Sequence, residues 1–78
     1  MPPEALRALV RQTFAAALGH DVADDADFFA EGGDSLAAEQ VLTGLSAALS
    51  LPLPGWLLLD HPTAGALAGA IRSALGPA

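Results

Sequence analysis

The stretch Gly32-Gly33-Asp34-Ser35-Leu36 decides how this chain is organised. Two glycines give a flexible approach, Asp34 and Ser35 carry side chains that accept hydrogen bonds, and a long run with apolar residues at helical spacing follows. This order is typical of a helix N-terminus, with Asp or Ser at the cap. Ser35 would then lie where free backbone N–H groups and the helix dipole favour negative charge, so that a phosphate ester on it is electrostatically reasonable. The alternative is that Ser35 only caps the helix.

Size and composition restrict the class of protein. The 78 residues make one domain, residues 1–78, and the absence of cysteine excludes a thiol nucleophile, a thiolate metal site and disulfides. The chain starts without a basic and apolar signal segment, and its longest apolar run, residues 51–59, contains prolines and is too short to span a bilayer. We therefore expect a cytoplasmic protein without membrane contact. Met1 and the short tails favour a discrete protein.

Charge is distributed unevenly along the chain. The net charge is −6, and no basic residue lies between Arg11 and Arg72. Without a basic stripe to neutralise phosphates, nucleic-acid binding is not expected. Seven of the nine acidic residues, which we call the acidic collar, are Asp21, Asp24, Asp25, Asp27, Glu31, Asp34 and Glu39. The acidic collar either steers a basic partner to Ser35 or only keeps a loop soluble.

Apolar periodicity predicts three main helices and a short third one. The expected segments are residues 4–18, 35–49, 55–59 and 63–75, ended by Gly19 in the first case and by Gly76-Pro77 in the last. No stretch alternates with period two, so the expected fold class is all-α, a small four-helix bundle. The apolar faces of the main helices are expected to contain Leu6, Leu9, Val10, Phe14, Ala17 and Leu18, then Leu36, Ala38, Leu42, Leu45 and Leu49, and finally Leu67, Ala68, Ile71 and Leu75.

The connection formed by residues 20–34 is long for so small a domain. A loop of this length needs an anchor, and Phe28 and Phe29 are its only large apolar residues besides Val22. We expect at least one of the two phenylalanines to lie in the core. Gly44, inside the second helix, costs about 1 kcal/mol relative to Ala and indicates either a close packing contact or tolerance.

Two motifs stand in register along most of the chain. Residues 28–36 read FFAEGGDSL, and Leu53-Pro54 is followed by LLDHPT at residues 58–63 and by Leu67-Ala68. They resemble F-F-x-L-G-G-[DH]-S-L and L-P…L-F-E-H-P-T-x-x-x-L-A of the thiolation, or peptidyl carrier, domains of nonribosomal peptide synthetases, within the acyl carrier protein family. The double glycine favours peptidyl carriers. Polyketide-type acyl carriers remain the alternative.

The resemblance implies that Ser35, flanked by Gly33, Asp34 and Leu36, carries 4'-phosphopantetheine. A phosphopantetheinyl transferase would attach this group with coenzyme A as donor, and its thiol would hold an aminoacyl or peptidyl group as a thioester. The protein itself would catalyse nothing and would present the group at high effective concentration in nonribosomal peptide and antibiotic biosynthesis. The implied further partners of this monomer are an adenylation enzyme and condensation or tailoring enzymes.

The resemblance also implies where partners bind. In the family, the exposed face of the second helix and the following short helix form the docking surface. The residues expected to contact partners here are Glu39, Gln40, Trp56 and Leu57. Leu58 and Leu59 match the buried pair of the family, so Trp56 is expected to be at least partly exposed; the alternative is a ring lying flat over the core. The departures from the family pattern are Glu31, Gln40, Gly44, Ser46, Gly55 and Trp56.

An enzyme is the first competing hypothesis. Gly-Asp-Ser-Leu is also the nucleophile motif of a lipase and esterase family, whose Ser needs a His base, an Asp orienter and an α/β scaffold. No strand precedes Gly33, and Leu58 stands where that family would place Asp, three residues before His61. Hydrolytic activity is therefore not expected.

Metal binding and a plain interaction module are the other hypotheses. Asp25 and Asp27 have the spacing of a calcium-binding EF-hand, but Phe29 stands at the next ligand position. The two histidines, His20 and His61, are isolated in the sequence, and no metal site is expected. A small helical docking module with an unmodified serine remains as an alternative function.

Overall fold

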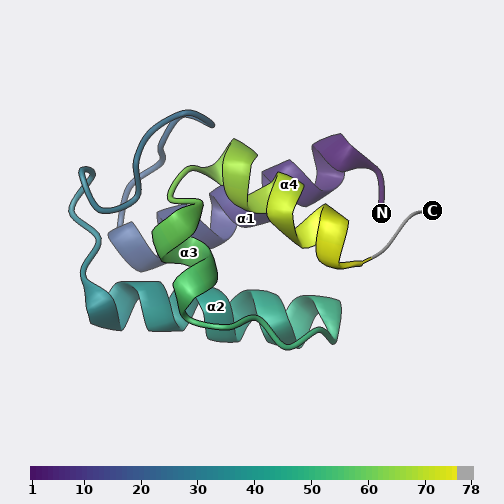
Figure 1. Cartoon of the computed structure of the whole chain (residues 1–78). Helices are drawn as coiled ribbons and strands as arrows, with labels where there is room; N and C mark the ends of the chain where they lie inside the picture. Colours follow the sequence, from purple (N-terminus) through teal and green to yellow (C-terminus); the bar gives the residue numbers. More distant parts are fainter. Residues whose placement is uncertain (76–78) are drawn as a thin grey trace.

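The computed structural model describes residues 1–75 and contains four helices in the expected order. They are α1 (Pro3–Leu18), α2 (Ser35–Leu49), α3 (Trp56–Asp60) and α4 (Ala64–Ala74). Helix α1 packs against both α2 and α4, and the short α3 lies between α2 and α4 (Figure 1). No strand occurs in residues 1–75, so the all-α four-helix prediction is confirmed. The expected stop at Gly76-Pro77 lies outside the described residues.

The ends of the helices follow from local chemistry. Pro3 opens α1, because its fixed φ suits the first helical turn and its missing N–H has no partner there. Gly19 ends α1 with a left-handed φ of 83°, and its amide donates a hydrogen bond to the Ala15 carbonyl at 2.8 Å. At the start of α4, the Thr63 hydroxyl accepts a hydrogen bond from the Ala66 amide at 3.1 Å.

The core receives side chains from every helix and from the long loop. Its buried members are Leu6, Val10, Phe14, Val22, Phe28, Val41, Leu42, Leu45, Leu57, Leu58, Ala64, Leu67, Ala68 and Ile71. The Phe28 ring lies 4.8 Å from the Phe14 ring, centroid to centroid, and Phe29 packs partly buried at the edge of the core. The expectation that a phenylalanine anchors the loop is confirmed for Phe28.

Five apolar residues lie differently from the sequence expectation. Leu36 is 64% exposed and Val41 is fully buried instead. At about 100° per residue, Leu36 falls on the side of α2 opposite to Leu45, nine residues later. Leu75 is 49% exposed, since it follows the last residue of α4. Ala38 and Leu49 are only partly buried.

The inward pair on α3 is shifted by one residue. Leu57 and Leu58 are 7% and 0% exposed, whereas Leu59 is 66% exposed. The expectation that Leu58 and Leu59 are the buried pair is therefore wrong for Leu59. A helix as short as α3 can turn only one narrow side toward the core. Its contact with α4 decides that Leu57 and Leu58 lie on this side.

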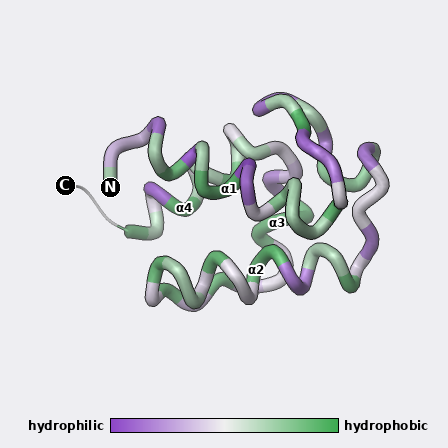
Figure 2. The backbone as a smooth tube through the Cα atoms, turned by 180° about the vertical axis from the view of Figure 1, so that it is seen from behind, coloured by the Kyte–Doolittle hydropathy of each residue, from purple (hydrophilic) through white to green (hydrophobic). Residues whose placement is uncertain are grey.

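Ion pairs fasten the long loop to α1. Arg7 lies 3.1 Å from Asp24, and Arg11 lies 3.1 Å from Asp21 and 3.6 Å from Asp24. Figure 2 shows hydrophilic and hydrophobic stretches alternating along this loop. In the part of the chain that the structure describes, no helix is both long and apolar enough to cross a bilayer.

Candidate functional site

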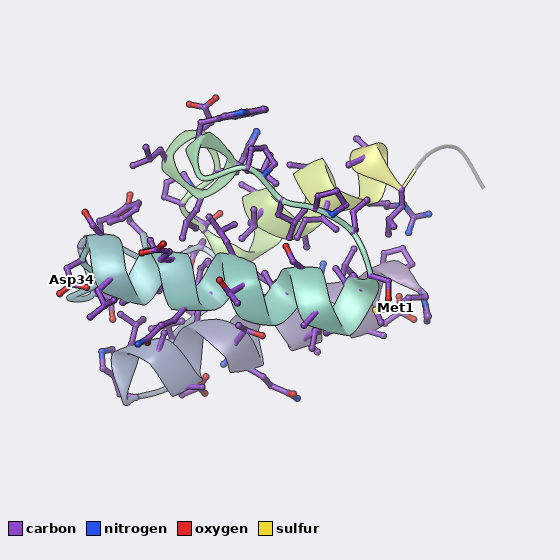
Figure 3. All side chains as sticks on the ribbon, turned by 90° about the horizontal axis from the view of Figure 1, so that it is seen from below. Met1 and Asp34 are labelled. Atoms are coloured by element: carbon purple, nitrogen blue, oxygen red, sulfur yellow. The ribbon has the colours of Figure 1, made fainter. Side chains whose placement is uncertain are left out.

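The start of α2 is capped by Asp34. Its carboxylate oxygen Oδ1 accepts a hydrogen bond from the Ala37 amide at 2.8 Å, and its carbonyl oxygen accepts one from the Ala38 amide at 2.9 Å. Figure 3 labels Asp34 at one end of α2, toward the opposite end of the molecule from Met1. The cap therefore does not use Ser35, which is the first helical residue and is exposed. The alternative in which Ser35 only caps the helix is wrong.

The two glycines before Asp34 meet different requirements. Gly32 has φ of 106°, a conformation that residues with a Cβ rarely adopt. At Gly33 a Cβ would lie 2.7 Å from the Phe28 carbonyl oxygen and would overlap the Phe28 ring. The first glycine is thus required by backbone conformation and the second by space.

Phe28 connects the two sequence motifs in space. Its amide donates a hydrogen bond to the Pro62 carbonyl at 2.8 Å, and its carbonyl accepts one from the Gly33 amide at 3.0 Å. A second bond between the loop and α4 runs from the Gly65 amide to the Asp24 carbonyl at 3.0 Å. The approach to Ser35 is therefore fixed against the junction of α3 and α4.

The residues of the acidic collar fall into two groups: some carboxylates have partners within the protein, and others are exposed to solvent. Asp21 and Asp24 pair with the arginines of α1, and Asp27 accepts hydrogen bonds from the Phe29 and Ala30 amides at 2.8 and 3.0 Å. The hydrogen bond from Arg11 is the largest cause that lowers the pKa of Asp21. Asp25, Glu31 and Glu39 are exposed. The acidic collar therefore offers fewer free carboxylates near Ser35 than the sequence suggests.

His20 contacts the segment that leads to Ser35, a contact that the sequence did not reveal. Its Nδ1 lies 3.0 Å from the Asp21 carbonyl oxygen and its Nε2 lies 3.1 Å from the Glu31 carbonyl oxygen. These two hydrogen bonds raise the pKa of His20, the one to Asp21 most. Because both partners are backbone atoms, no residue pattern in the sequence marks the contact.

The residues expected to contact partners are not all on the surface. Glu39 and Gln40 of α2 are exposed, and Trp56 of α3 is 57% exposed, as expected. Leu57 is buried, so the expectation of an exposed Leu57 is wrong, and Leu59 is the exposed leucine of α3. Among residues 1–75 no three His, Asp or Glu side chains gather as a metal site would require.

The geometry at Ser35 fits a phosphate ester. The hydroxyl belongs to an exposed residue in the first turn of α2, where backbone N–H groups without helical partners and the positive end of the dipole favour an anion. The Asp34 carboxylate is engaged by the Ala37 amide, and the residues of the first turn of α2, from Ser35 on, add no acidic side chain that would oppose the phosphate. The residues present therefore suit an esterified serine.

The chain is similar to known proteins in sequence and in fold. The chain is 44% identical over 75 residues to the spectinabilin polyketide synthase system protein NorB of Streptomyces orinoci, a match that covers 91% of this chain and 3% of NorB. The structure of this chain resembles that of BlmI, a type-II acyl carrier protein from Streptomyces verticillus involved in bleomycin biosynthesis. The TM-score is 0.91 and the sequence identity is 24%, over 94% of this chain and 89% of BlmI.

A third relative is a carrier of the peptidyl class. The free-standing peptidyl carrier protein of an Acinetobacter baumannii secondary metabolic pathway has a TM-score of 0.87 and 30% identity, over 94% of this chain and 95% of its own. The sequence model of the family described as the phosphopantetheine attachment site matches residues 8–71. Since that match runs from α1 into α4 and includes Ser35, the chain belongs to the phosphopantetheine attachment-site family of acyl and peptidyl carrier proteins.

Proposed function

We propose that Ser35 is the attachment residue for 4'-phosphopantetheine and that the chain is a non-catalytic carrier in natural-product biosynthesis. The observation that supports this most directly is that Ser35 is exposed at the first position of α2 while Asp34 provides the cap. When attached, the group supplies a thiol that holds the carried acyl group as a thioester. The protein contributes a tether that raises the effective concentration of this group at partner enzymes.

The residues around Ser35 prepare it for a transferase. Asp34 fixes the first turn of α2 through the Ala37 amide, and Gly33 keeps the approach close to Phe28. An ordered segment loses less conformational freedom when an enzyme binds it, so binding is stronger. The chain itself does not need a base beside Ser35, since activation of the hydroxyl is the task of the transferase.

The carried group is an aminoacyl or peptidyl unit in this proposal. The double glycine at residues 32–33 and the structural likeness to a peptidyl carrier protein at 30% identity support it. The 44% identity to a segment of a polyketide synthase protein favours a polyketide-type acyl unit as the second candidate. Loading assays on the pantetheinylated protein, with amino acid-activating enzymes in one set and acyltransferases in the other, distinguish the two.

The attachment is tested by intact mass after incubation with coenzyme A, Mg²⁺ and a broad-specificity phosphopantetheinyl transferase. We expect a gain of one phosphopantetheine per chain. Ser35→Ala should lose the gain and keep the helical circular dichroism spectrum, and the control Ser73→Ala, an exposed serine on α4, should keep both. A mass gain that survives Ser35→Ala contradicts the assignment.

Partner docking is the second part of the proposal. Trp56 and Leu59 present apolar surface on α3, while Glu39 and Gln40 are exposed on α2. A large exposed aromatic side chain is a common anchor at protein interfaces. We infer that loading and downstream enzymes bind α3 through Trp56, whereas the transferase binds the acidic collar.

A further inference from the structure

His20 bridges two backbone carbonyl groups. Its ring nitrogens lie 3.0 Å from the Asp21 carbonyl oxygen and 3.1 Å from the Glu31 carbonyl oxygen. A carbonyl oxygen only accepts hydrogen bonds, so both ring nitrogens must carry a proton for both bonds to form. A neutral imidazole has one N–H and the imidazolium has two. The complete bridge therefore belongs to the protonated ring.

The bridge closes the loop just before the site. Asp21 follows the end of α1 closely, whereas Glu31 directly precedes the two glycines that lead to Ser35. Glu31 is also held by its amide, which donates a hydrogen bond to the Asp27 carbonyl at 3.0 Å. Loss of the His20 contact would leave the Glu31 carbonyl free, and this carbonyl is part of the peptide group that begins the approach.

We propose that His20 is a positioning residue for Ser35: its protonated ring ties Glu31 to the start of the loop. Loss of the proton from Nε2, with Nδ1–H kept on the shorter bond to the Asp21 carbonyl, releases the Glu31 carbonyl. The consequence for attachment rests on the proposed function of Ser35. With the tie closed, the transferase meets a segment that is already ordered, so attachment is faster. With the tie open, part of the loop becomes ordered only when the transferase binds. This ordering costs conformational entropy, so KM rises.

The charges around the ring set the direction of the pH dependence. The groups that face His20 are the carboxylates of Asp21 and Glu31, and Arg11 of α1 is held against Asp21 at 3.1 Å. The hydrogen bonds to the two carbonyls, and then the two carboxylates, raise the pKa of His20. The stability that these contacts add to the folded chain is therefore fully present below the ordinary histidine pKa. It is lost as the pH rises through the pKa that His20 has in the folded state. The tie is closed on the acid side and opens on the alkaline side.

The tie is tested first by NMR on the unmodified chain, independently of any attachment. The ring signals of His20 and the amide signals of Gly32 and Gly33 are followed between about pH 5.5 and 8.5, a range that covers histidine titration. We expect both glycine amides to shift with the midpoint of His20, above the ordinary histidine value. His20→Gln should abolish these shifts, and the control His61→Gln, which changes the other histidine, should keep them. Glycine amides that do not follow the His20 titration would overturn the tie.

The positioning role is tested by kinetics over the same pH range. The kcat/KM for attachment is measured for the parent and for His20→Gln, and their ratio removes the transferase's own pH dependence. We expect the kcat/KM of the parent to be about two to five times that of His20→Gln at the acid end, because the parent has the lower KM. At the alkaline end the ratio should fall to about one. A ratio that does not change with pH overturns the positioning role while leaving attachment intact. If neither protein is modified at all, the proposed function fails, and the NMR titration still decides the tie.

Discussion

Gly32 and Gly33 are adjacent, yet each must be glycine for its own reason. The backbone of Gly32 has φ of 106°, while a Cβ at Gly33 would collide with the ring and the carbonyl oxygen of Phe28. Since a backbone oxygen cannot swing aside as a flexible side chain can, the collision at Gly33 must displace either Phe28 or the start of α2. A pair of glycines in a sequence thus combines two constraints that only the structure separates.

Gly33→Ala should lower the melting temperature and slow phosphopantetheine attachment together, because displacing Phe28 disturbs both the core and the approach to Ser35. Thermal unfolding and the intact-mass assay measure the two effects. Gly55→Ala is the matched control, since a Cβ there meets nothing within 4 Å and φ is −59°. Equal behaviour of the two variants would show that the contact with Phe28 is not limiting.

Phe28 and Phe29 differ in burial although they are neighbours in sequence. Phe28 is fully buried and Phe29 only partly, with their rings 5.4 Å apart in an edge-to-face arrangement. Phe28→Ala should therefore destabilise the fold by about 3–5 kcal/mol, the usual range for a buried phenylalanine. Phe29→Ala should cost clearly less. Urea unfolding followed by circular dichroism measures both, and a reversed order would show that the loop is anchored through Phe29.

At the scale of the helices, the apolar faces are narrower than the sequence suggests. Helix α2 buries Val41, Leu42 and Leu45 and leaves Leu36 exposed beside Ser35. A helix of 15 residues touches its neighbours along part of its length only, so an apolar residue in its first turn need not reach the core. The exposure of Leu36 could have been predicted from the sequence, because at about 100° per residue it lies on the side of α2 opposite to Leu45.

Gly44→Ala is expected to stabilise the protein by up to about 1 kcal/mol, the difference in helix propensity between the two residues. Gly44 is exposed, and a Cβ there would make an ordinary contact with the Thr13 methyl group at 3.6 Å. Of the two alternatives for this glycine, a close packing contact is therefore absent, and tolerance explains it. The melting temperature should rise, as it should for Gly69→Ala in α4, where the Cβ meets nothing within 4 Å. A fall for Gly44→Ala alone would reveal a tighter contact between α1 and α2.

At the scale of the whole molecule, charge and apolar surface are separated. The acidic collar lies in the loop and the first half of α2, whereas the exposed side chains of Trp56 and Leu59 lie on α3. Salt screens charge contacts at the surface and has little effect on apolar ones. The two surfaces can therefore be distinguished by how partner reactions depend on salt.

Trp56→Ala should slow aminoacylation of the pantetheinylated protein and leave attachment and melting temperature nearly unchanged, because the side chain is 57% exposed. Raising salt should slow attachment more than aminoacylation. Leu75→Ala, at an exposed leucine after α4, is the control for loss of apolar surface in general. Equal losses in both reactions, or a large fall in melting temperature for Trp56→Ala, would contradict separate docking surfaces.

The sequence by itself determined the four helices, their limits to within one residue, and the place of Ser35 at the start of α2. Helix limits depend on local residues such as Gly19, Thr63 and Asp34, and local chemistry is readable along the chain. The tertiary structure decided which leucine of α3 turns inward and that His20 reaches Glu31. These outcomes depend on where a helix meets its neighbours and on backbone atoms far apart in sequence. Residue type alone carries no record of either.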